Sequence, residues 1–437
     1  MFGTKPCYLL ILLFCLHCHS YGQKAKYAGA KFGKHLRIAG KIGNNIHVWS
    51  SSTQQVHIYP EETTFTLHIF SEDLQLKAEK KIELGKARSW NLNFQATDSC
   101  YYADIRYITD RNERLLLKVE QDGKTTDVSE TPGLWTQALI SDQPGREYSI
   151  SLKNNNLFSA KIDNNNIDKS INQNDIIMIG NEHLKQPEYL KKIIIKKTSI
   201  KNKNKNSQRV YGSTLENFFF PLTKATDTSL FVCAYLEPEK KGNRDNFNGS
   251  PFLFISQFDT SLSEINNAPL LLKAKQREKN EIFVPLNMFP MRERLFIISL
   301  GQYLKGNIAY SASSMNYGYV TTSLRITITD KRTGLFKDSV IESKSGPYNY
   351  EWENSFMSTA ENRIDLFCVQ NYSLFKRGIS YLSIDMNGNM NERDMVVDGH
   401  YDYFLPSARI IAAGVLLMPC RRKGRMDLLK LEYNHTN

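Results

Sequence analysis

The segment from Asn362 to Val397 constrains the fold of this chain more than any other, because it reads as strands joined by short turns. Arg363 to Val369 is a short run rich in β-branched and aromatic residues between turn formers, which is the pattern of a strand. Ile379 to Ile384 alternates in polarity, and Asn387-Gly388 follows it. Asn-Gly readily supplies the two positive φ angles of a type I′ hairpin turn. We therefore predict a three-strand antiparallel meander with a type I′ turn.

Weaker copies of this meander recur along the chain, and the clearest matches surround the turn after the middle strand. For example, Val119 to Gly123 matches Ile384 to Gly388, with Asp-Gly in place of Asn-Gly. The anchors of the series are separated by 49, 43, 96, 71 and 55 residues: Ser71, Glu120, Asp163, Asp259, Asp330 and Asp385. The step of 96 is two units, which predicts a hidden copy between Tyr189 and Asn204. The step of 71 requires a long insertion, and Glu432 marks one further copy.

A period of roughly 40 to 55 residues with several strands in each copy is typical of a β-propeller. We therefore predict an all-β chain, a propeller of about seven (six to eight) antiparallel blades. Closure of the ring should pair His35–Lys41 or Asn45–Trp49 with the last blade, near Val415–Met418 or Met426–Tyr433. Helix is expected only at Pro285–Arg292 and Glu188–Lys192.

The repeat resembles that of secreted bacterial β-propeller proteins, across nearly the whole chain that follows the first 22 residues. It matches no defined subfamily, because the sequence lacks the Trp-Asp dipeptide, the kelch Gly-Gly pair and the sialidase Ser-x-Asp-x-Gly-x-x-Trp box. The resemblance is architectural and implies only the fold, since one architecture serves many functions.

The first 22 residues have the pattern of an export signal. Lys5 precedes the apolar run Cys7–Cys15, and small residues stand before Gln23. We predict a signal peptide at residues 1–22 and a single propeller domain at 23–437, without a transmembrane segment. The protein is expected to be exported, as a periplasmic, cell-surface or extracellular monomer. The remaining cysteines lie in or near apolar runs, which favours buried thiols over disulfides: Cys100, Cys233, Cys368 and Cys420.

The net charge of +11 is concentrated in two clusters. Lys185 to Arg209 holds nine Lys or Arg residues against one Glu, and Arg421 to Arg425 adds four. Such clusters can bind polyanions, yet a solvated loop and charged flanks that protect an apolar strand explain them better. Because the chain is expected to be exported, nucleic acid is not the expected partner.

No local motif identifies a reaction, a metal site or a cofactor. The nucleophile elbow, the His-Glu-x-x-His motif, phosphate-binding glycine loops and paired zinc cysteines are all absent. Asp385 to Glu392 resembles a calcium loop, but its glycine falls at position four rather than six, so the hairpin explains it better. His47, His57 and His68 could converge on a metal only if the fold brings them together. We therefore predict no metal and no cofactor.

Tyrosine-rich stretches late in the chain are the best candidates for ligand binding. Gly, Pro and Asn interleave the rings, which suggests loops that could stack on sugars or hold a peptide. The alternative is that these aromatics form one packing face of a blade strand. The candidate residues are Tyr317, Tyr319, Tyr348, Tyr350, Trp352, Tyr401 and Tyr403.

Three functions are compatible with these features. The first is a non-enzymatic scaffold that binds a glycan or protein ligand, which the absence of catalytic motifs favours. The second is a propeller glycoside hydrolase or lyase that acts on polysaccharide through carboxylates such as Glu351, Glu353 or Asp402. The third is a structural subunit of an envelope complex.

Overall fold

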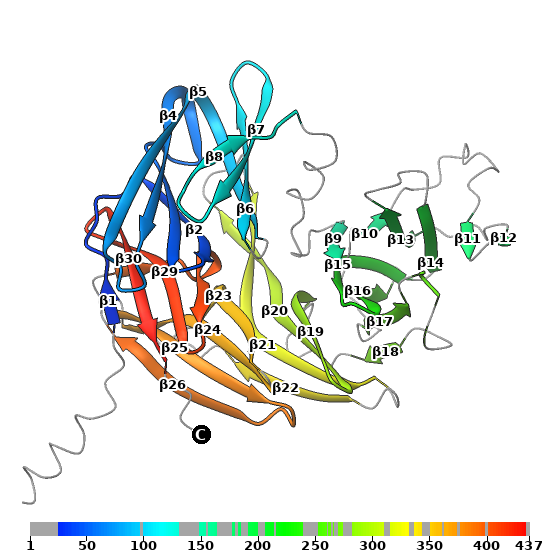
Figure 1. The fold of residues 1–437 in the computed structure, drawn as a ribbon. Helices are drawn as coiled ribbons and strands as arrows, with labels where there is room; N and C mark the ends of the chain where they lie inside the picture. The colour runs from blue at the N-terminus through cyan, green and yellow to red at the C-terminus, as the bar shows by residue number, and fades with distance from the viewer. Residues whose placement is uncertain are drawn as a thin grey trace, which may run out of the picture.

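The computed structural model describes residues 25–96, 99–130, 148–153, 156–163, 177–179, 182–184, 191–199, 206–213, 216–238, 252–259, 261–263, 265, 270–273, 282–309, 315–331, 336–342, 350–360, 362–373, 376–397 and 401–433. Within these residues the chain is all-β, as predicted, and the one helical element is the 3-10 turn η2 (Leu405–Ser407). All strand pairs given below are antiparallel (Figure 1). No helix in the described part of the chain is long and apolar enough to cross a membrane.

The N-terminal sheet contains two meanders that share one long strand. β5 pairs with β4 between Leu76 and Ser89 and with β6 between Ser89 and Ala96. Gly85, with a positive φ of 76°, lies where the register of β4 against β5 shifts. The sheet follows chain order: β2 (His35–Ile42), β3 (Asn45–Ser51), β4 (Val56–Phe70), β5 (Leu76–Ala96), β6 (Cys100–Ile108), β7 (Asn112–Glu120) and β8 (Thr125–Asp127).

Four further sheets are four-stranded meanders, and one of them carries an inserted hairpin, β11 (Ile177–Ile179) with β12 (Glu182–Leu184). The first has the order β14 (Asn206–Ser213), β13 (Lys191–Ser199), β10 (Asn156–Asp163), β9 (Tyr148–Lys153). The second comprises β15 (Glu216–Ala225), β16 (Ser229–Pro238), β17 (Phe252–Asp259) and β18 (Leu270–Lys273). The third comprises β19 (Ile282–Met291), β20 (Arg294–Ala309), β21 (Met315–Asp330) and β22 (Phe336–Glu342). The fourth comprises β23 (Tyr350–Ala360), β24 (Arg363–Ser373), β25 (Lys376–Asp385) and β26 (Met390–Val397).

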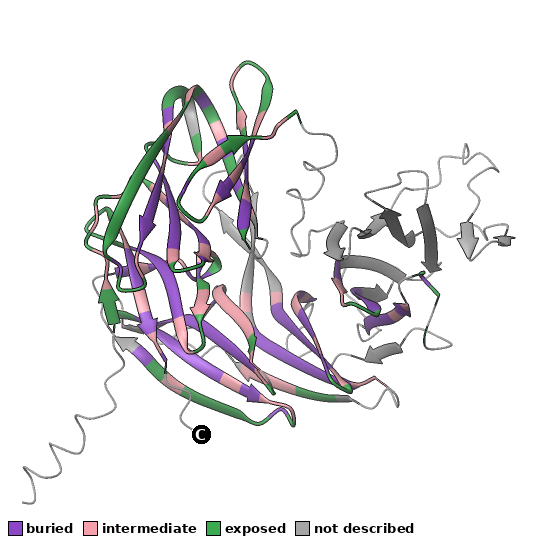
Figure 2. Cartoon of the chain, viewed as in Figure 1, coloured by how far each residue is buried: buried purple, intermediate pink, exposed green. Residues whose placement is uncertain are grey.

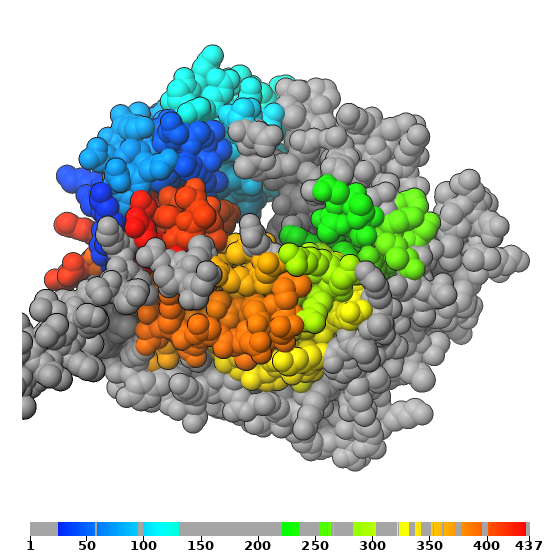
Figure 3. Space-filling model, turned by 60° about the horizontal axis from the view of Figure 1, so that its bottom comes forward, coloured from blue at the N-terminus to red at the C-terminus, as the bar shows by residue number. Residues whose placement is uncertain are grey.

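The last sheet joins the two ends of the described chain. β1 (Ala25–Tyr27) pairs with β30 (Arg425–Glu432), which pairs with β29 (Val415–Arg422); β27 (Tyr401–Tyr403) and β28 (Arg409–Ala412) both pair with β29. We predicted that His35–Lys41 or Asn45–Trp49 pairs with the last sheet. That prediction was wrong, because Ala25–Tyr27 forms the pair instead. β2 instead begins the next sheet and contacts β28 and β29. Figure 3 shows the blue N-terminal and red C-terminal segments lying side by side.

Hydrophobic clusters fill the spaces between consecutive sheets, and β24 shows how the sequence encodes this arrangement. Ile364, Leu366 and Cys368 pack against the β19–β22 sheet, whereas Phe367 and Val369 pack against the last sheet. Alternate side chains of a strand point to opposite faces, so a strand covered on both faces is apolar throughout. Figure 2 shows buried positions running along such central strands. The same packing joins the last sheet to β2–β4, through Leu36, Ile38 and Leu417 among others.

Four of the anchor turns share one hydrogen-bond pattern. The backbone N–H of the anchor residue donates to the carbonyl four residues later, and the anchor carbonyl accepts the N–H of the residue three positions later. The fourth residue of each has a positive φ: Leu74, Gly123, Leu262 and Gly388. Each turn joins the third strand of a meander to its fourth strand.

The turn predicted at Asn387-Gly388 is present, but its type I′ assignment was wrong, because only Gly388 has a positive φ. The Asp385 carboxylate accepts the backbone N–H groups of Asn387 and Asn389, each at 2.8 Å. Although partial burial raises the pKa of Asp385, these hydrogen bonds lower it below the usual value. The calcium-like spacing is therefore explained by a carboxylate that caps its own turn.

Two further predictions are corrected or confirmed by the strands. Pro285 to Met291, predicted as a helix, lies in β19, which is an edge strand with a register shift between Pro285 and Asn287. Proline is tolerated there because an edge strand has free N–H positions. The other predicted helix lies partly outside the described residues, and its Lys191 and Lys192 belong to β13. The four cysteines are free and buried, as predicted.

Candidate functional site

Three of the aromatic residues predicted to bind ligand have buried side chains, and the side chains of the other four lie outside the described part of the structure. Trp352 is 0 % exposed, Tyr401 7 % and Tyr403 2 %, and they belong to the clusters on either side of the β23–β26 sheet. Their rings therefore pack between sheets, in agreement with the alternative interpretation. Tyr317 and Tyr319 lie on β21 and Tyr350 on β23, but the description does not extend to their side chains. Tyr348 lies outside the described residues.

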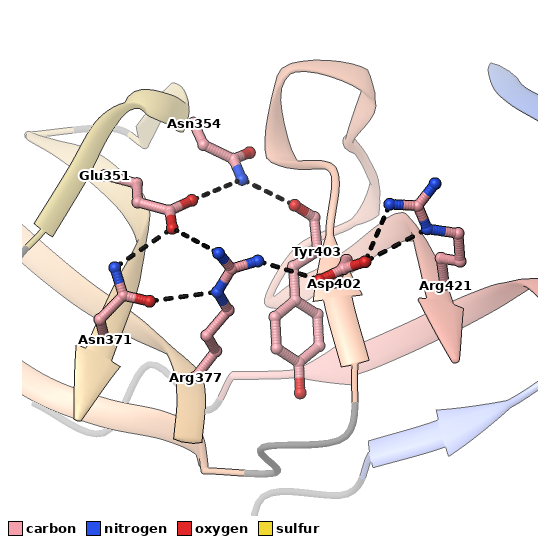
Figure 4. A network of polar contacts seen from close by, with 7 residues as sticks. All are labelled: Glu351, Asn354, Asn371, Arg377, Asp402, Tyr403 and Arg421. Carbon is pink, nitrogen blue, oxygen red and sulfur yellow. Dashed lines mark hydrogen bonds and ion pairs between the residues drawn. The ribbon is translucent and has the colours of Figure 1, made fainter. Parts of the chain in front are cut away.

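A network of polar side chains lies next to these aromatic stretches, between the β23–β26 sheet and the last sheet (Figure 4). Arg377, the second residue of β25, lies at its centre. Its guanidinium contacts Glu351 Oε1 at 3.4 Å and Asp402 Oδ1 at 2.9 Å, and its Nε donates to Asn371 Oδ1 at 3.2 Å. Asn371 in turn donates to Glu351 Oε1 at 3.2 Å. One guanidinium thus links carboxylates from two sheets.

The network continues on both sides of Arg377. On the last sheet, Arg421 donates from Nε and Nη2 to the same oxygen, Asp402 Oδ2, at 3.2 and 3.0 Å. On β23, a bulge between Glu351 and Ser355 releases Asn354 from the ladder. Its amide donates to the Tyr403 carbonyl at 2.7 Å and accepts the Leu405 N–H at 3.0 Å. Asn354 therefore fixes the backbone that leads from β27 into η2.

The charged members of the network are half-exposed, with side-chain exposures of 44 % for Arg377, 28 % for Glu351, 40 % for Asp402 and 49 % for Arg421. A general acid needs a carboxyl whose pKa burial or a like charge has raised. Here each carboxylate is occupied by a guanidinium, Glu351 by Arg377 and Asp402 by Arg377 and Arg421. The arrangement suits recognition of polar groups better than proton donation. The side chain of Glu353, the other acid considered above, is outside the description.

Aromatic rings border the network on the side of the last sheet. The guanidinium of Arg421 lies 5.6 Å from the centre of the Phe404 ring, and that of Arg422 lies 5.3 Å from the Tyr401 ring. Tyr401 also stacks on Tyr27 of β1, with ring centres 4.6 Å apart. The predicted rings therefore support this surface from beneath, and the charged side chains form it.

Sequence reasoning missed Arg377, Asn371 and Asn354 as members of the site. No local motif marks them, because they come from three strands and meet residues of another sheet. Arg421 was noted only as a member of the C-terminal basic cluster. Asp402 and Glu351 were predicted as candidate acids near aromatic rings. Only the packing of two sheets brings these six residues together.

The two predicted histidines whose side chains are described, His47 and His68, do not converge on a metal site. His47 contacts Tyr101 Oη at 3.3 Å and the Gln121 carbonyl at 3.0 Å, whereas His68 contacts other partners. Burial lowers the pKa of both imidazoles, which favours their neutral forms. The side chain of His57 is outside the description, and no group of three metal-binding side chains occurs within the described residues.

Ser50, His68 and Glu79 form a relay with the connectivity of a hydrolytic triad. His68 Nε2 lies 2.8 Å from Ser50 Oγ, and Nδ1 lies 2.8 Å from Glu79 Oε1. However, Ser50 is only 3 % exposed, and the edge of Phe32 covers His68 with ring centres 5.0 Å apart. Ser50 also lies near the end of β3, paired with Leu36 of β2 and Thr66 of β4, so its backbone belongs to the sheet and not to an exposed turn. The relay is therefore a cross-strand hydrogen-bond chain.

An open depression of about 500 Å³ lies elsewhere, at the end of the N-terminal sheet. Lys118 and Glu120 on its wall form an ion pair at 3.5 Å, and Asn45 donates to the Gln121 carbonyl at 2.9 Å. The depression contains none of the network residues. Its lining residues are Asn45, Ser99, Cys100, Lys118, Glu120, Gln121 and Asp122.

No protein-family model matches this chain. No curated protein sequence matches it either. Among solved structures, a mutant of the Synechocystis apocarotenoid oxygenase shares 9 % identity at a TM-score of 0.43, over 95 % of this chain and 94 % of that one. The cobalt-substituted form of that oxygenase shares 8 % at 0.41, with the same coverage. An α-L-arabinofuranosidase from Fusarium graminearum, in complex with an iminosugar inhibitor, shares 8 % at 0.32, over 94 % and 98 %.

Proposed function

We propose that the chain is a seven-bladed β-propeller. Six sheets of four or more strands, one of which contains two meanders sharing β5, give seven units. The first strands of neighbouring units contact one another: β2 contacts β5 and β28, and β15 contacts β9 and β19. The pairing of β1 with β30 ties the first segment to the last unit. Such contacts are what a ring of blades requires.

We further propose that this propeller is an exported binding scaffold, with a glycan or protein ligand at the surface of the Arg377 network. The observation that carries the proposal is the pairing of Glu351 and Asp402 with one half-exposed guanidinium. This arrangement presents donors and acceptors to a ligand without leaving a free carboxyl for acid catalysis. For the same reason it does not support the hydrolase or lyase alternative through these two acids.

Glycan and protein arrays probed with the full chain would test this proposal. We expect a ligand whose binding weakens about tenfold in the Arg377→Gln and Arg421→Gln variants, since a hydrogen bond to a charged group contributes roughly 1.5 to 3 kcal/mol. Arg292→Gln is the matched control, because Arg292 is exposed in the distant turn between β19 and β20. A ligand that binds all three variants equally would place the binding surface elsewhere. Release of reducing sugar from a polysaccharide panel by the wild type, and not by Glu351→Gln, would favour the enzyme instead.

A further inference from the structure

Two arginines from opposite ends of the chain meet between β2 and β28. These strands are edge strands of neighbouring sheets, and they contact each other. Arg37 of β2 donates through Nη1 to Ser407 Oγ at 3.1 Å, and Ser407 precedes Arg409 of β28 by two residues. Arg409 donates through its own Nη1 to the Ala408 carbonyl at 2.8 Å. Both contacts are with neutral oxygens.

Neither guanidinium has an anionic partner: no carboxylate of the described residues forms an ion pair with Arg37 or Arg409. Arg37 is half-buried, and its Nε is buried without a hydrogen-bond acceptor. Burial lowers the pKa of both arginines, and the charge of Arg37 lowers that of Arg409 further. Arg409 is exposed, so the cost of this arrangement falls mainly on the half-buried Arg37, because partly buried charges are normally paired.

We propose that Arg37 and Arg409 form an oxyanion-binding site, which takes a carboxylate or phosphate group of a soluble ligand. Guanidinium groups are suited to this role because their fixed N–H donors match the oxygens of both anions. Arg409 is exposed and can contact the anion directly, while Ser407 holds Arg37 beside it. Asn354 supports the site indirectly, since it binds the Leu405 N–H at the start of η2.

The site goes beyond the scaffold function proposed above and does not depend on it. The Arg377 network binds its own carboxylates, Glu351 and Asp402, so its cations are already neutralised. The Arg37–Arg409 pair has no carboxylate partner among the described residues, so it would bind a negatively charged group. A failure of either proposal would leave the other intact, because the two use different residues.

Calorimetric titration of the full chain at constant ionic strength tests the inference, with inorganic phosphate and glucuronate as separate probes and glucose as the neutral control. We expect saturable binding of at least one anion and none of glucose. Arg409→Gln should weaken that binding about tenfold or more, because it removes the charge-assisted hydrogen bonds. Arg425→Gln, which changes an exposed arginine at the first position of β30, should leave it within about twofold.

A second readout separates a binding role from a structural one. Without added anion, the melting temperature of Arg409→Gln should equal or exceed that of the wild type, because one of two repelling charges is gone. Phosphate or glucuronate should then raise the melting temperature of the wild type and not that of the variant. Absence of anion binding in the wild type, or equal binding in Arg409→Gln, would overturn the proposal.

Discussion

The polar contacts of the N-terminal sheet and those between the last two sheets are built in opposite ways. In the N-terminal sheet, His47, Trp49 and Tyr101 form a chain of neutral groups that are all 0 % exposed. Between the last two sheets, Glu351, Arg377 and Asp402 are charged and 28 to 44 % exposed. Neutral groups can be buried if their hydrogen bonds are satisfied, and a charge such as Asp104 is buried only with paired arginines, whereas the charges between the last two sheets remain where water reaches them.

This difference in exposure indicates which polar region contributes to stability and which is suited to recognition. A buried hydrogen-bonded group is costly to leave unsatisfied, so the chain containing Tyr101 should matter mostly to folding. Exposed ion pairs contribute little to stability, so a cluster of them in one place is better suited to binding. Mutations in the two regions should therefore differ in the size of their effects on unfolding.

The largest effect should follow from Tyr101→Phe. The substitution leaves Trp49 Nε1, which donates to Tyr101 Oη at 2.8 Å, and His47 Nδ1 without that partner. We expect the free energy of unfolding to fall by about 3 kcal/mol, as for a buried donor left unsatisfied. Urea denaturation would measure it, with Tyr102→Phe as the control because Tyr102 is half-buried on the same strand. A loss below about 1 kcal/mol would contradict the assignment of this chain to stability.

A smaller effect should appear when the pH falls, and His35 is the best residue for measuring it. Burial, with a further contribution from Arg37, lowers the pKa of His35 from 6.5 to about 4. The unfolded chain therefore binds the proton first, and stability is lost as the pH falls from 6.5 towards 4. After allowance for partial exposure, this contribution is on the order of 2 kcal/mol.

The His35→Gln variant isolates that contribution from the titration of carboxylates. We expect its stability relative to the wild type to rise as the pH is lowered from 7 to 4, and to stay constant between pH 7 and 8. Urea denaturation at each pH would provide the values. A difference that does not change with pH would mean that His35 is not buried in its neutral form.

The sequence predicted the strands and several turns of this molecule, because those depend on neighbours in the chain. Arg363 to Val369 is apolar throughout since both of its faces are covered, and Gly388 follows a strand since its turn needs a positive φ. The candidate site was less predictable. Trp352 was chosen for its aromatic ring, but that ring fills the space between two sheets. Arg377 was overlooked because its partner Asp402 lies on a different sheet, a relation that depends on packing.

The smallest effect should follow from Arg377→Ala. The substitution removes one cation from Glu351 and Asp402, but Asp402 keeps its two hydrogen bonds from Arg421. We expect a loss of about 1 kcal/mol in urea denaturation, smaller still in 1 M salt because salt screens exposed charges. Arg425→Ala is the control, as an exposed arginine of the last sheet without an ionic partner among the described residues. A loss as large as that of Tyr101→Phe would remove the distinction between the two regions, because the network would then also be a determinant of folding.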